Sequence, residues 1–318
     1  MLDNIDKRIL FELEKNARIN DSTLAKIVKK SKDSVRYRIK KLEEEKIITG
    51  YKTWIDYSKL NYRTSTIYLN LINIPEKKER LIEDLRKDKR VYWLGVAEGI
   101  WNIGITYFIK SNQDLFEIKS DLLSKYKDLI VDSKITSLAS VSVHEKTFLV
   151  NEKSSFITFT EDIENYELEE IEKKILKELY NDSKINLSDL AFKTKSTIDI
   201  VRSRMKKLER LGVIIRYTIY IDYKKIGYEL YKTFIYLGSH TKEEIESVMR
   251  YAEKSDKIIN VVKQIASWDF EFIIFAKNFE EYTNTINELT KTNPKMFRKF
   301  ETSIMSEDII FPCKEVYF

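Results

Sequence analysis

Residues 2–60 read LDNIDKRILFELEKNARINDSTLAKIVKKSKDSVRYRIKKLEEEKIITGYKTWIDYSKL, and the same pattern returns in residues 168–226. The two stretches align without a gap at an offset of 166 residues, with 27 identities among 59 pairs. Such a period is far longer than that of a solenoid repeat. We therefore infer that a whole two-domain unit has been duplicated within the chain.

Each copy of the repeat predicts three short helices followed by a strand. Apolar residues at helical spacing indicate an amphipathic helix over residues 3–16, with Asp3 as its N-cap. A second helix is expected to be capped by Asp21 or Ser22, and a third by Ser31. The alternating stretch IITGYKTWIDY then predicts a strand. Three short helices with a tight turn before the third are typical of a winged or plain helix-turn-helix unit.

The rest of each half predicts a βαββαβ order, which is the ferredoxin-like arrangement, and the fold class is α+β. In the first half we expect strand 64–73, helix 76–88, strands 90–96 and 101–109, helix 112–127 and strand 132–150. In the second half we expect strand 230–237, helix 241–255, strands 258–265 and 269–277, helix 279–290 and strand 297–310. The expected domains are helix-turn-helix units at 1–60 and 167–226, ferredoxin-like domains at 61–150 and 227–318, and a linker at 151–166.

Composition predicts packed domains in a reducing compartment. Hydrophobic residues make up 43% of the 318, enough to form cores, and the net charge is only +5. The one cysteine, Cys313, excludes a disulfide framework and a multi-cysteine metal site. No signal region or apolar run of about 18 residues is present. We expect a cytoplasmic, chromosome-associated protein with no metal and no cofactor.

Basic residues concentrate on the expected third helix. Between Lys29 and Lys41 there are seven basic residues and one acidic residue, so the local charge of +6 exceeds that of the whole chain. Lys and Arg neutralise DNA phosphates, and side chains near the N-terminus of such a helix reach base edges in the major groove. The candidate DNA-contacting residues here are Lys29, Ser31, Lys32, Ser34, Arg36, Tyr37, Arg38, Lys40 and Lys41.

The equivalent helix of the second unit keeps much of this charge but begins differently. Ile198 and Ile200 replace Lys32 and Ser34, and an apolar leading end is suited to thymine methyl groups. We therefore predict that the two units have unequal sequence preferences. The candidate DNA-contacting residues here are Lys195, Thr197, Ile198, Ile200, Arg202, Ser203, Arg204, Lys206 and Lys207.

The opening L-x-x-I-D/E-K and the helix V-R-x-R-x-K-K-L-E, present in both halves, resemble the Lrp/AsnC family of feast–famine regulators. The resemblance implies a helix-turn-helix joined to a ferredoxin-like domain that dimerises and, in many members, binds an amino acid near the loop between its second and third strands. That loop corresponds here to 97–102 and 265–269. The candidate effector-binding residues are Glu98, Gly99, Trp101, Asn102, Trp268 and Asp269.

Two departures from the family pattern concern these loops. The first half has Asn102 where an Asp is expected, and the second half keeps Asp269 without a glycine nearby. The two tryptophans, Trp101 and Trp268, also fit packing in a core or an interface.

The function that these features favour is a DNA-binding transcription regulator that is not an enzyme. Its expected partners are double-stranded DNA, an amino acid as a candidate effector, and itself, through pairing of its two α+β sheets or as a homodimer. One alternative is an architectural DNA-binding protein of low sequence specificity. Another is an enzyme. Some proteins that resemble this family decarboxylate haem precursors, and they use histidines of the effector domain. The two histidines here, His144 and His240, lie outside the corresponding loop.

Overall fold

The computed structural model describes residues 2–150, 152, 155–160 and 164–312, so Cys313 and parts of the predicted linker lie outside the described residues. The first half contains α1 (Asn4–Lys15), α2 (Asp21–Val28), α3 (Lys32–Glu44), β1 (Ile48–Ile55), β2 (Arg63–Leu71), α4 (Pro75–Lys87), β3 (Val91–Gly99), β4 (Ile103–Ile109), α5 (Asn112–Lys125) and β5 (Ile130–His144). The second half contains α6 (Glu170–Asn181), α7 (Leu187–Thr194), α8 (Ile198–Arg210), β7 (Ile214–Ile221), β8 (Glu229–Leu237), α9 (Lys242–Lys254), β9 (Ile258–Ile265), β10 (Phe270–Ala276), α10 (Phe279–Thr292) and β11 (Phe297–Ile310).

The predicted α+β class and the βαββαβ order of both halves are confirmed. Each half also has the strand order of a ferredoxin-like sheet, β5-β2-β4-β3 in the first and β11-β8-β10-β9 in the second. The stretch predicted as a linker differs from the expectation, because its residues Phe156–Thr160 form strand β6, which pairs with the end of β5. Three short 3-10 helices complete the described elements: Tyr57–Lys59, Thr147–Leu149 and Tyr223–Ile226.

The two ferredoxin-like sheets join into one closed sheet. Strand β5 pairs with β2 of its own half over its first residues and with β9 of the other half over its last ones. Strand β11 does the same with β8 and β3. All of these pairs are antiparallel, and together they close the ring β2-β4-β3-β11-β8-β10-β9-β5. The chain is therefore an internal pseudo-dimer, joined by the pairing of its two α+β sheets that the sequence had offered as one possibility.

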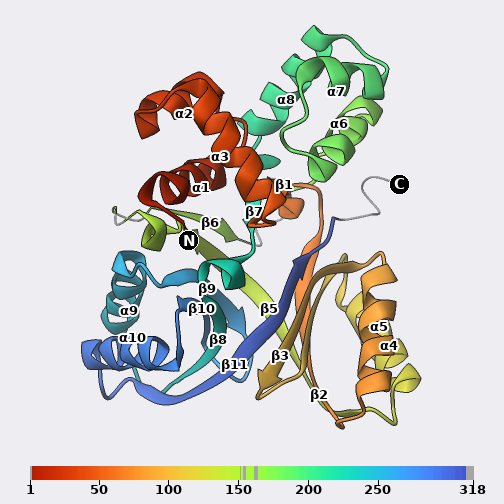
Figure 1. The fold of residues 1–318 in the computed structure, drawn as a ribbon. Helices are drawn as coiled ribbons and strands as arrows, with labels where there is room; N and C mark the ends of the chain where they lie inside the picture. Colours follow the sequence, from red (N-terminus) through yellow and green to blue (C-terminus); the bar gives the residue numbers. More distant parts are fainter. Residues whose placement is uncertain (1, 151, 153–154, 161–163, 313–318) are drawn as a thin grey trace.

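Helices cover the outer faces of the closed sheet, and aromatic residues fill part of its interior. Helices α4 and α5 lie on one side and α9 and α10 on the opposite side, each pair over its own half of the sheet (Figure 1). Between the two sheets, Tyr68, Trp101, Phe234 and Trp268 form a cluster drawn from both halves. The interior thus joins the two halves by apolar burial as well as by strand hydrogen bonds.

A buried ion pair lies in this interior. Lys232 Nζ is 2.8 Å from Glu271 Oε2, and both side chains are almost fully buried. Glu271 Oε1 accepts hydrogen bonds from Tyr68 Oη at 2.7 Å and from Trp268 Nε1 at 3.2 Å. Lys232 also lies over the ring of Trp93, 4.2 Å from its centroid. The network spans the two halves because Tyr68 and Trp93 belong to the first and the other three to the second.

The helix-turn-helix units sit together at one end of the closed sheet (Figure 1). The strands that leave them, β1 and β7, pair with each other antiparallel as a separate two-stranded sheet. Each of these strands also contributes to the core of the other unit. Ile219 and Ile221 of β7 pack in the core of the first unit, and Ile55 of β1 packs in the core of the second. Neither unit therefore has a complete core without a strand from the other half.

We predict that Glu271→Ala lowers the free energy of unfolding by about 3–5 kcal/mol, because it leaves the Lys232 ammonium buried without its partner. Replacing both members of the pair, with Lys232→Met and Glu271→Leu, removes the unpaired charge and should recover most of the loss. Chemical denaturation followed by tryptophan fluorescence measures both effects. A single variant as stable as the unaltered protein would contradict the structural role of the pair.

Candidate nucleic-acid interface

The helix-turn-helix geometry is set by caps and by one left-handed residue at each turn. Asp3 caps α1 in a capping box and Ser31 caps α3, as predicted, but the N-cap of α2 is Asn20 rather than Asp21 or Ser22. The Asn20 side chain accepts the Thr23 N–H at 2.8 Å, which puts Asp21 inside the helix. An Asn side chain at this position satisfies an N–H that has no partner within the helix.

The turn between the second and third helices has the same backbone in both units. Lys29 and Lys195 end their helices with φ of 53° and 54°, in the left-handed region. The next residue returns a hydrogen bond to the preceding helix, from Lys30 N to Ala25 O at 3.0 Å and from Ser196 N to Ala191 O at 2.9 Å. The turn therefore places the N-terminus of α3, and likewise that of α8, directly beside the end of the preceding helix.

Helix α3 buries one stripe and exposes the opposite one. Val35, Ile39 and Leu42 are buried against α1 and α2. Among the predicted contact residues, Ser34 and Arg38 are half-buried, whereas the others of the first unit are exposed: Lys29, Ser31, Lys32, Arg36, Tyr37, Lys40 and Lys41. In the second unit Arg204 and Lys207 are half-buried, and the exposed ones are Lys195, Thr197, Ile198, Ile200, Arg202, Ser203 and Lys206.

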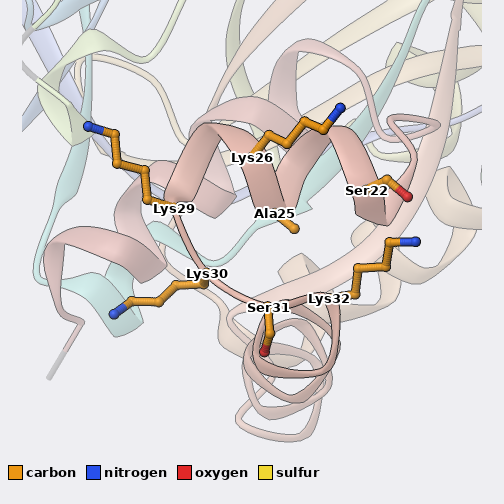
Figure 2. Close-up of a pocket in the computed structure, with 7 residues that line it drawn as sticks. All are labelled: Ser22, Ala25, Lys26, Lys29, Lys30, Ser31 and Lys32. Atoms are coloured by element: carbon orange, nitrogen blue, oxygen red, sulfur yellow. The ribbon is translucent and has the colours of Figure 1, made fainter.

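A shallow lysine-lined hollow lies at the turn of the first unit (Figure 2). Its lining residues are Ser22, Ala25, Lys26, Lys29, Lys30, Ser31 and Lys32. Sequence reasoning missed Lys26, Lys30 and Ser22, which lie on α2 or in the turn rather than on the third helix. They could have been predicted, because in this motif the helix before the recognition helix contacts the DNA backbone.

Two predicted base-contacting arginines make ion pairs with the first helix of their own unit. Arg38 Nη1 is 2.8 Å from Asp3 Oδ2 and 2.6 Å from Asp6 Oδ1, and these hydrogen bonds raise the pKa of the guanidinium. Arg204 pairs in the same way with Glu169, and at 3.4 Å with Glu172. Arg38 and Arg204 thus tie the third helix of each unit to the N-terminus of its first helix.

The two units are also fixed to each other. Arg18 Nη1 donates to the carbonyl oxygens of Ser183 at 2.7 Å and Ile185 at 2.8 Å, across the pair of units. Related hydrogen bonds join Ala17 N to Tyr217 O and Ser183 N to Tyr51 O, at positions that correspond in the repeat. Because these contacts are made mainly by backbone atoms, the separation of α3 and α8 is set by the main chain.

The predicted effector-binding loops are occupied by contacts within the chain. Asn102 Oδ1 accepts the Leu71 N–H and Asp269 Oδ2 accepts the Leu237 N–H, both at 2.8 Å and at matching places in the two halves. Trp101 and Trp268 are buried between the sheets.

The other two residues of the first loop also have neighbours within the chain. Glu98 is exposed and pairs with Lys78 at 2.9 Å. Gly99 has a φ of +141°, and a Cβ there would lie 2.5 Å from the Thr302 carbonyl oxygen, so this position needs glycine.

Neither a membrane-crossing helix nor a metal site appears in the described part of the chain. Within residues 2–150, 152, 155–160 and 164–312, no helix is long and apolar enough to span a bilayer. In the same residues no group of three or more His, Cys, Asp or Glu side chains is placed to hold a metal ion.

Comparison with known proteins identifies relatives of half this length. The family model for winged helix-turn-helix DNA-binding domains matches twice, at residues 2–49 and 168–215. An uncharacterised HTH-type transcriptional regulator of Pyrococcus horikoshii is 30% identical over 149 residues, covering 46% of this chain and 97% of the relative. The HTH-type transcriptional regulator LrpA of Pyrococcus abyssi is 37% identical over 125 residues, covering 39% of this chain and 88% of the relative.

Solved structures of a siroheme decarboxylase match nearly the whole chain. The siroheme decarboxylase NirDL, crystallised with an iron-uroporphyrin III analogue, superposes with a TM-score of 0.65, covering 99% of this chain and 96% of that chain. The sequence identity is 15%, so the likeness concerns the fold alone. A fold like that of this whole chain is therefore also found in an enzyme.

We predict that Arg38→Ala costs about 1 kcal/mol of stability, because Arg38 links two helices of the first unit through partly screened ion pairs. Arg36 is the matched control: it is more exposed, it pairs with Asp21 within the same unit, and Arg36→Ala should leave stability unchanged. Thermal unfolding of both variants measures the difference. Equal melting temperatures for the two would show that the Arg38 ion pairs contribute nothing.

Proposed function

Since the chain belongs to the Lrp/AsnC family of helix-turn-helix transcription regulators, we propose that it is a regulator in which one chain supplies both DNA-reading heads of a sequence-specific unit. Related regulators match only half of this chain. A duplicated chain supplies two heads and the sheet that joins them. The heads are residues 2–60 and 168–226, and the recognition helices are α3 and α8.

The observation that supports this proposal most strongly is that both heads lie at one end of the molecule in a fixed relationship (Figure 1). The pairing of β1 with β7 and the Arg18 hydrogen bonds hold them there. The exposed faces of α3 and α8 carry Lys and Arg, which neutralise phosphates and release counterions. A rigid pair of basic helices suits two half-sites of one duplex at a defined spacing.

Within each head, we assign the residues at the start of the recognition helix to base edges and the flanking lysines to phosphates. In the first head we assign Lys32, Ser34 and Tyr37 to base edges. We assign Lys26, Lys29 and Lys30 of the lysine-lined hollow to the DNA backbone, together with Lys40 farther along α3. Arg38 acts chiefly by positioning α3, since its guanidinium already pairs with Asp3 and Asp6.

Although this chain shares its fold with a siroheme decarboxylase, our proposal assigns it no histidine-based catalytic site. His144 is buried, and desolvation together with the nearby Lys146 charge lowers its pKa to about 4, so it is neutral at pH 7. His240 is exposed, and its Nδ1 lies 2.8 Å from the Gly238 carbonyl oxygen. His144 ends β5 in the first half, His240 lies between β8 and α9 in the second, and neither belongs to the loops 97–102 or 265–269. We therefore favour a regulator over an enzyme.

We expect selection from a random duplex library at near-physiological salt to enrich a motif with two half-sites about one or two helical turns apart. This spacing follows from heads that the main chain holds at one separation. Sequencing of the bound fraction measures it. Binding without enrichment would instead favour an architectural protein, since phosphate contacts alone carry no sequence information. Failure to bind any duplex would contradict the proposed function.

A further inference from the structure

The two heads have the same backbone but different surfaces where they would meet DNA. At the repeat offset of 166 residues, Lys26, Lys32 and Ser34 of the first head correspond to Phe192, Ile198 and Ile200 of the second. The side chains of the second head are exposed: Phe192 by 86%, Ile198 by 40% and Ile200 by 46%. Where the first head carries these three polar residues, the second thus carries three exposed apolar ones, which we call the apolar patch: Phe192, Ile198 and Ile200.

Packing within the chain does not account for the apolar patch. The core stripe of α8 consists of Val201, Met205 and Leu208, which are buried as their counterparts in α3 are. Ile198 and Ile200 lie in the first turn of α8, at its first and third positions, and neither belongs to that buried set. Exposed apolar residues that gather at one place mark an interaction site, whereas scattered ones do not.

The position of the patch identifies the chemistry that it can meet. Side chains at the start of a recognition helix reach base edges in the major groove. An isoleucine side chain has no hydrogen-bonding group, so it cannot read the nitrogen and oxygen atoms of the bases. The apolar group that base pairs present in that groove is the C5 methyl of thymine.

Charge around the patch favours DNA over a protein as the occupant. Lys195, Arg202 and Lys206 remain exposed in the same head, and they correspond to Lys29, Arg36 and Lys40 of the first head. Protein–protein interfaces are depleted of charged residues at their centre, whereas a DNA site needs cations for the phosphates on either side. The pairing of β1 with β7 and the Arg18 hydrogen bond also hold this head fixed against the first one.

We propose that α8 reads thymine methyl groups through Ile198 and Ile200, with Phe192 extending the contact, so that the operator is asymmetric. This rests on the proposed function. One half-site is recognised by the polar side chains of α3. The other is rich in A·T pairs and is recognised by apolar contact. A single chain can read such a site because its two heads need not be identical, unlike those of a symmetric homodimer.

The test replaces thymine by deoxyuridine in one half-site at a time of a selected operator. Uracil keeps the hydrogen-bonding groups of thymine and lacks only the C5 methyl. We expect the dissociation constant to rise about fourfold for each contacted methyl removed from the half-site read by α8. The same substitution in the other half-site should change the dissociation constant by less than about twofold, because α3 presents Lys32 and Ser34 there.

Two matched variants exchange the surfaces of the heads. Ile198→Lys with Ile200→Ser gives α8 the residues of α3 and should abolish the sensitivity to deoxyuridine. Lys32→Ile with Ser34→Ile is the reciprocal change and should make the first half-site sensitive. All four positions lie outside the core stripes, so circular dichroism should report an unchanged fold in both variants.

The failures can be told apart. If the unaltered protein binds its operator but deoxyuridine has no effect in either half-site, the methyl-reading proposal is wrong while the proposed function stands. In that case the double variant Phe192→Lys, Ile198→Lys tests another occupant. If its mass in analytical ultracentrifugation is lower than that of the unaltered protein, the apolar patch is instead an interface between proteins. If no duplex is bound at all, the proposed function fails and this proposal fails with it.

Discussion

The exchange of partners along β5 and β11 is the constraint on which the rest of the structure depends. Each of these long strands begins beside a strand of its own half and ends beside a strand of the other. The exchange closes the sheet and leaves neither half with a free edge at those positions. Edges of exposed sheets tend to pair with other chains, and the closed ring satisfies that tendency within the molecule.

The exchange of β1 and β7 extends the same logic to the helix-turn-helix units. Each strand leaves one unit and contributes apolar side chains to the core of the other. Separating the heads would expose both cores, so the distance between the recognition helices cannot vary freely. Duplication within one chain then has a consequence that pairing of identical chains lacks: the two heads can change independently. The lysine-lined hollow of one head and the apolar patch of the other illustrate that freedom.

Local sequence patterns were enough to predict most of the elements but not their partners. The caps at Asp3 and Ser31 and the βαββαβ order both follow from short-range rules, and the structure agrees with them. The partner exchange of β5 and β11 joins residues far apart in the chain, and periodicity carries no information about it. The strand β6 was missed for a similar reason, since it forms only by adding to the end of β5.

At the candidate interface, the sequence predicted the helices but not the partner of each Lys or Arg side chain. Arg38 has its partners Asp3 and Asp6 more than thirty residues away, so its ion pairs were not visible from α3 alone. The α2 cap fell on Asn20 because the helix begins one residue earlier than expected. Phe192, by contrast, could have been found from the repeat alignment, in which it corresponds to Lys26.

The central claim is that one chain provides both reading heads of a DNA-binding unit. Native mass spectrometry of the protein on a selected duplex with two half-sites tests it most directly, since the mass gives the number of chains per duplex. The account predicts one chain on a duplex that contains both half-sites, and loss of tight binding when either half-site is scrambled. Two chains on each such duplex, with one head of each chain left unbound, would contradict it.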